Sequence, residues 1–89
     1  MTIWKFPLEA TDEQTIYVPR GAKILSVRTQ GETPCLWALV DPDAEKEPTA
    51  VRIYGTGHDV PDDPGEFVGT VFLHGGSLVF HVFVGEVDA

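Results

Sequence analysis

The chain has 89 residues, 43% of them hydrophobic, which is enough for one small domain with a modest core, so we expect a single domain over residues 1–89. Six Lys and Arg stand against fourteen Asp and Glu, a net charge of −8 that disfavours direct nucleic-acid binding and anionic membranes. The sequence shows neither an apolar stretch of roughly 18 residues, as a membrane-spanning helix needs, nor a signal-peptide pattern at its start.

The first half of the chain reads as strands, because apolar and β-branched residues alternate between turn signals. Leu25 and Val27 are predicted to share one face of their strand, opposite Ile24. The last of these segments, 34–40, is apolar on both faces, which predicts a central strand. The strands expected here cover residues 2–8, 15–18, 22–29 and 34–40.

The second half begins with a charged loop at 41–48, in which residues 44–47 are expected to form one helical turn. Segment 58–65 holds two Pro and three Asp and is expected to be irregular. Gly75 and Gly76 predict a tight hairpin turn. In the last strand His81 should share a face with Val79 and Phe83, opposite Leu78, Phe80 and Val82. The strands expected here cover residues 51–54, 67–73 and 77–84.

Six to seven short strands with Gly and Pro turns predict an all-β fold, either a small antiparallel β-sandwich or a small barrel. Segments 36–40 and 78–84 offer apolar side chains on alternate faces, more than one sheet face of a small domain needs. A second sheet or a second subunit must cover this surplus, so we expect a homodimer.

Cys35 is the single cysteine, so an intramolecular disulfide and a cysteine-based zinc site are both ruled out. This usage fits a reducing cytoplasmic compartment. Because Cys35 lies in a strongly apolar segment, we expect a buried structural thiol rather than a nucleophile.

The best catalytic or metal-binding candidate is His58, with Asp59, Asp62 and Asp63 just beyond it. Histidine and carboxylates on a flexible loop can bind a metal or transfer protons. Their spacing matches no established template, and a solvated loop is the simpler interpretation. His74, beside the Gly75–Gly76 turn, is expected to be exposed.

A second acidic segment alternates Asp41, Asp43 and Glu45 like the opening of a calcium loop. The sixth position of such a loop should be Gly, and here it is Lys46. The calcium interpretation therefore fails. Because neither acidic segment completes a metal-binding or catalytic template, we expect no metal, no cofactor and no enzymatic activity.

A small-molecule site would need a local cluster of cations despite the acidic total. Gly55-Thr56-Gly57 lacks the spacing of a phosphate-binding loop, and no helix pattern follows it. The available cations are Arg20, Lys23, Arg28 and Arg52, with Trp37 or Tyr54 for base stacking. A small-molecule site is favoured if these residues lie close together in the folded protein, and it is excluded if they are dispersed.

Segments 3–6, 19–27, 35–42, 52–58 and 78–83 together resemble an uncharacterised family of small proteins encoded in bacteriophage and prophage genomes. The string Ile-Tyr-Gly-Thr-Gly-His at residues 53–58 is the most distinctive part of this resemblance. The resemblance implies a protein that acts by binding in the host cytoplasm: inhibiting a host enzyme, blunting a defence system or sequestering a signalling nucleotide. It makes the loop around this string the first candidate binding site, formed by Tyr54, Gly55, Thr56, Gly57, His58 and Asp59.

These observations favour a non-catalytic, phage-encoded homodimer that binds and modulates a host protein. The −8 charge suits a basic partner such as a defence nuclease. Two alternatives stay open, a small-molecule or cyclic-nucleotide binder and an enzyme that uses the His58 loop.

Overall fold

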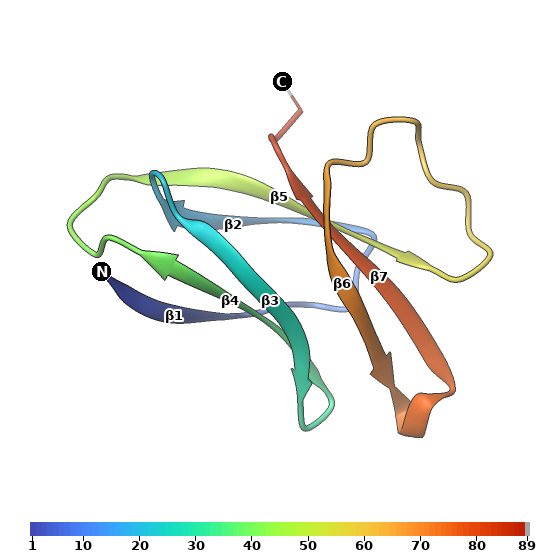
Figure 1. Cartoon of the computed structure of the whole chain (residues 1–89). Helices are drawn as coiled ribbons and strands as arrows, with labels where there is room; N and C mark the ends of the chain where they lie inside the picture. Colours follow the sequence, from blue (N-terminus) through green and yellow to red (C-terminus); the bar gives the residue numbers. More distant parts are fainter. Residues whose placement is uncertain (89) are drawn as a thin grey trace.

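The computed structural model describes residues 1–88, which form seven β-strands in two antiparallel sheets (Figure 1). The all-β prediction is confirmed. Of the two architectures left open, the structure shows a sandwich, since the strands of residues 1–88 do not close into a barrel. The strands are β1 (Thr2–Pro7), β2 (Glu13–Pro19), β3 (Lys23–Gln30), β4 (Thr33–Val40), β5 (Lys46–Gly55), β6 (Glu66–Leu73) and β7 (Leu78–Gly85).

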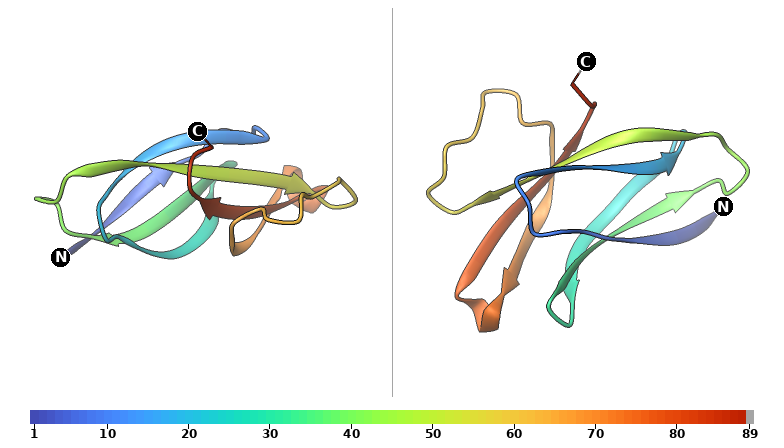
Figure 2. Two further views of the ribbon diagram at one scale, coloured as in Figure 1. Left: turned by 90° about the horizontal axis from the view of Figure 1, so that it is seen from above. Right: turned by 180° about the vertical axis from the view of Figure 1, so that it is seen from behind.

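The three-stranded sheet has the order β1-β4-β3, and the four-stranded sheet has the order β2-β5-β7-β6. All neighbouring strands are antiparallel. The view from above shows the two layers, with β2 and β5 over the three-stranded sheet (Figure 2). The prediction that residues 34–40 form a central strand is confirmed, because β4 is paired on both sides.

The hydrophobic core lies between the inner faces of the two sheets. Leu36 on β4 and Val51 and Val82 on the opposite sheet are completely inaccessible to solvent. Burial of each such side chain contributes about 1.5–3 kcal/mol to folding. Cys35 is only 2% exposed and is a free thiol, which confirms that it is buried.

Strands β3 and β6 are the unpaired edges on one side of the sandwich and lie next to each other. Gly69 on β6 permits this approach, because a Cβ atom there would lie 3.0 Å from Cγ1 of Val27 on β3. Between the two edges runs an open groove of about 460 Å³.

The predicted loop at 41–48 is wrong in its last three residues, because β5 already begins at Lys46, and residues 44–47 form no helical turn. Glu47 and Pro48 pair with Val18 and Tyr17 of β2. Pro48 is tolerated in this strand because β7 pairs with β5 only from Ala50 onward, so no second neighbour needs an N–H donor from Pro48.

The prediction that Leu25 and Val27 share a face is also wrong. The register between β3 and β4 shifts between Ile24 and Ser26, so Leu25 is the extra residue of a β-bulge. Leu25 is therefore 43% exposed, whereas Val27 is 5% exposed and belongs to the core.

The β6–β7 connection is longer than the predicted two-residue turn. It contains a short 3-10 turn, η1 (His74–Gly76), in which His74 is exposed as predicted and takes a positive φ of 52°. The backbone N–H of His74 donates to the Glu32 carboxylate at 3.2 Å, which ties this turn to the β3–β4 hairpin. No helix in the described part of the chain has the length and apolar character that a membrane crossing requires.

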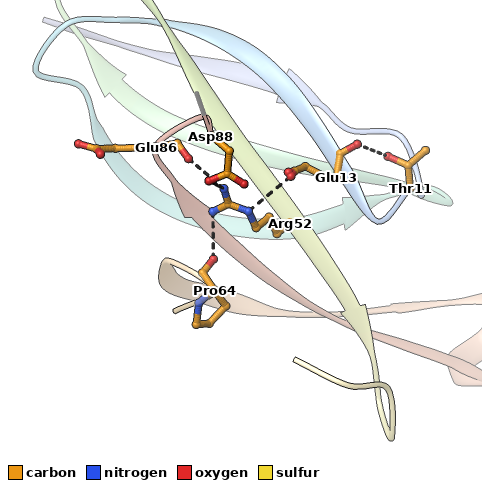
Figure 3. A network of polar contacts seen from close by, with 6 residues as sticks. All are labelled: Thr11, Glu13, Arg52, Pro64, Glu86 and Asp88. Atoms are coloured by element: carbon orange, nitrogen blue, oxygen red, sulfur yellow. Dashed lines mark hydrogen bonds and ion pairs between the residues drawn. The ribbon is translucent and has the colours of Figure 1, made fainter. Parts of the chain in front are cut away.

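Arg52 on β5 clamps three separate segments together (Figure 3). Its guanidinium donates to the carbonyl of Pro64 at 3.3 Å and to that of Glu86 at 2.9 Å. It also lies 3.6 Å from Glu13 and 3.5 Å from Asp88, and its side chain is only 12% exposed. Arg52 thus fixes the end of the 56–65 loop and the segment after β7 against the sheet.

Replacing Arg52 by Met is expected to lower the free energy of unfolding by about 2–3 kcal/mol, because two charge-assisted hydrogen bonds are lost from a largely buried site. For a domain of this size the melting temperature should fall by about 10–20 °C. The matched control is Glu13→Gln, which removes only an exposed ion pair and should cost less than about 1 kcal/mol. Equal losses in the two variants, measured by urea unfolding, would show that the carbonyl contacts contribute nothing.

Candidate functional site

The structure divides the predicted 54–59 site between the two faces of the four-stranded sheet. Tyr54 lies on the outer face, since its neighbour Ile53 is 5% exposed and belongs to the core. His58 lies toward the other face, because a Cβ added at Gly55 would meet the His58 ring at 2.9 Å. Gly57, with φ of 90°, forms the tight turn that folds His58 back over Gly55. Asp59 is exposed in the loop beyond this turn.

Three aromatic rings form a row across the outer face of β5, β7 and β6. The ring centroid of Phe83 lies 5.6 Å from that of Tyr54 and 5.3 Å from that of Phe67, both in edge-to-face geometry. Pairs of this kind contribute about 0.5–1.5 kcal/mol beyond the area they bury. Phe67 is nevertheless 55% exposed, so a large part of the row faces solvent.

His81 lies beside this row, directly opposite Tyr54 on one side and Thr70 on the other. The alternation predicted for the last strand is confirmed: Val82 is fully buried, and His81 shares the outer face with Phe83. The Thr70 hydroxyl lies 2.9 Å from Nδ1 of His81, and the Thr56 hydroxyl lies 2.7 Å from Nε2. Both ring nitrogens are thus occupied, which suits a ring held in place better than a general base.

We call the outer surface formed by Tyr54, Phe67, Thr70, His81 and Phe83 the aromatic face. The resemblance singled out only Tyr54 of these five residues, together with Thr56, which bonds to His81. Phe67 and Thr70 were missed because their relation to β7 depends on register. Strict alternation along β6 would place Phe67 and Thr70 on opposite faces, and a register shift between Phe67 and Gly69 brings both to the outer face, so the sequence held no signal for this pair.

Replacing Thr70 by Val removes one hydroxyl from His81 at nearly constant shape. We expect a loss of about 1 kcal/mol in unfolding free energy, because a half-buried ring nitrogen loses its partner. Thr15→Val on exposed β2 is the control and should change the free energy by less than about 0.5 kcal/mol. An unchanged stability for Thr70→Val in thermal melts would argue against a positioned His81.

The candidate groups for catalysis and metal binding are the exposed side chains of the loop around His58. Within residues 1–88, His58 forms no ion pair with Asp59, Asp62 or Asp63. In the same part of the chain no three His, Cys, Asp or Glu side chains lie close enough to hold a metal ion.

The four cations proposed for a nucleotide site do not form one cluster. Arg20 pairs with Glu47 at 2.8 Å and with Glu45 at 3.7 Å, and Arg52 is held in the clamp described above. Lys23 and Arg28 lie elsewhere, on β3 of the three-stranded sheet. The set as it was predicted is therefore separated in space.

Fold and site together define a small antiparallel β-sandwich with an open aromatic surface on its four-stranded sheet. The chain belongs to the family described as "Domain of unknown function (DUF7352)", whose model matches residues 1–89. No curated protein and no solved structure matches the chain. Membership of this family agrees with the expected uncharacterised family, and the phage origin stays a proposal.

Proposed function

We propose that this protein is a non-catalytic binding domain that engages a protein partner through the aromatic face. The observation that carries the proposal is the half-exposed row of Tyr54, Phe83 and Phe67 beside a fixed His81. Rigid aromatic side chains are the commonest anchors of protein interfaces, because they contribute large contact areas at low cost in conformational entropy.

The surroundings of the face favour a basic partner. The 56–65 loop, which begins directly after β5, carries exposed Asp59, Asp62 and Asp63, and Glu13 and Asp88 lie at the Arg52 end. An apolar centre with a charged rim is the usual anatomy of a specific interface. The rim carboxylates steer an oppositely charged partner and make its association dependent on salt.

The resemblance to phage-encoded proteins suggests that the partner is a host protein, in the cytoplasm of a bacterium. Inhibition or modulation of a host enzyme, such as a basic defence nuclease, fits both this origin and the net charge of −8. In the free protein a second copy would cover the aromatic face, so a homodimer that the partner displaces is part of this proposal.

The test is affinity capture from a bacterial lysate at low and at moderate salt, with the tagged wild type and two variants. Phe67→Ser removes an anchor from the aromatic face. Ile3→Ser changes a residue of similar exposure, 57% against 55%, on the other sheet. We expect one stoichiometric protein with the wild type and with Ile3→Ser, less of it at higher salt, and none with Phe67→Ser. Equal recovery with both variants would contradict the proposal.

A further inference from the structure

Most acidic residues of this protein lie in its loops, and the three-stranded sheet contains none of them. Strands β1, β3 and β4 contain three of the chain's six Lys and Arg, namely Lys5, Lys23 and Arg28, and none of its fourteen Asp and Glu. All three side chains belong to exposed residues, and none of them forms an ion pair within residues 1–88. A net charge of −8 therefore conceals one cationic surface.

The strand register places these cations around Trp37 on the outer face of the three-stranded sheet. Lys5 lies directly opposite Trp37 on β1, and the small residue Ser26 lies opposite it on β3. Lys23 is opposite Leu39 and Arg28 is opposite Cys35, the next outward positions along β4 on either side of Trp37. Trp37 itself is partly exposed at the centre.

The dimensions of this surface suit a short chain of phosphates. Lys23 and Arg28 lie opposite residues four positions apart on β4, a separation of about 13 Å along the strand. The backbone of Lys5 lies about 10 Å from β3, two strand spacings away, and its ammonium group reaches across β4 to donate to Oε1 of Gln30 on β3 at 2.7 Å. A partly exposed indole on a sheet surface, with cations on either side of it along the strand, is how single strands are bound by base stacking and phosphate contacts.

We propose that the outer face of the three-stranded sheet binds a short single-stranded oligonucleotide, with one base stacked on Trp37 and phosphates at Lys5, Lys23 and Arg28. The carboxylates elsewhere on the molecule limit the site to a few nucleotides, because a longer polyanion meets repulsion beyond the sheet. Duplex nucleic acid is excluded, since its bases are not free to stack on an exposed indole. This site is separate from the aromatic face, and neither proposal depends on the other.

The experiment measures the fluorescence anisotropy of fluorescein-labelled hexathymidylate titrated with the full chain. We expect saturable binding whose affinity falls with salt at a slope of about −2 in log–log form, as three phosphate contacts to a single strand imply. Lys23→Gln and Arg28→Gln should each weaken binding by at least fivefold. Trp37→Leu should weaken it by about fivefold or more through the lost stacking.

Thr15→Glu is the matched control, because it changes the net charge by the same one unit at an exposed position on the other sheet. Its affinity should stay within twofold of the wild type. Absence of binding, or an equal loss in Thr15→Glu and Lys23→Gln, would overturn the proposal. A third outcome would also overturn the proposal, in favour of an acidic protein ligand. In it, poly-L-glutamate of equal charge displaces the oligonucleotide, and Trp37→Leu leaves the affinity for the oligonucleotide unchanged.

Discussion

Gly65→Ala is expected to lower the free energy of unfolding by about 3–5 kcal/mol, on the order of 15–30 °C in melting temperature. Gly65 has a φ of 105°, a conformation that L side chains rarely adopt. A Cβ atom at this position would also meet the backbone carbonyl of Val84 on β7 far inside van der Waals contact, its nearest approach being 2.4 Å. The backbone of a central strand has no room to move away, so both penalties act together.

Gly57→Ala separates the two penalties. Gly57 lies in the same loop with a φ of 90°, but a Cβ atom there would have nothing within 4 Å. Only the backbone strain remains, and we expect a loss of about 1–2 kcal/mol. Urea unfolding of the two variants checks the difference, and equal losses would show that the loop does not pack on β7 as described.

Phe83→Asp is expected to convert the free protein from a dimer to a monomer, the second large effect. Phe83 is the central ring of the aromatic face and contacts both Tyr54 and Phe67. A carboxylate there would be desolvated in any contact between two copies, at a cost of several kcal/mol. Light scattering should give twice the 9.7 kDa of one chain for the wild type, and 9.7 kDa for the variant.

Phe83→Leu is the control for this prediction, because it keeps an apolar side chain on the same face and should remain dimeric. Circular dichroism must show an unchanged β-sheet spectrum for both variants. A wild type of 9.7 kDa, or a Phe83→Asp variant whose mass equals that of the wild type, would contradict self-association through this face.

Much of the fold was predictable because alternation decides which residues of a strand are buried. The segment at 78–84 shows this: Val82 is inaccessible, and His81 and Phe83 lie on the other side. Prediction failed where the alternation is interrupted. A bulge at Leu25 shifts one strand by a residue, and β5 starts at Lys46 because pairing with β2 outweighs the turn tendency of a charged segment containing Pro48.

The candidate site was less predictable, because it is assembled across strands. Thr56 and His81 are 25 positions apart in the chain, and Thr70 and His81 are 11 apart, yet their side chains bond. The local string at 53–58 suggested that Tyr54 and His58 act together, whereas a single turn at Gly57 sends them toward opposite faces. The net charge likewise gave no sign of the cationic surface on the three-stranded sheet. That surface is recognised only once the strand pairing places Lys5 beside Trp37.

The most direct test of a protein-binding aromatic face is an NMR titration of the isotope-labelled chain with the captured partner. We predict that the largest chemical-shift changes fall on Tyr54, Phe67, Thr70, His81 and Phe83, with the three-stranded sheet nearly unaffected. Changes concentrated on β1, β3 and β4, with the signals of the aromatic face unmoved, would contradict the account.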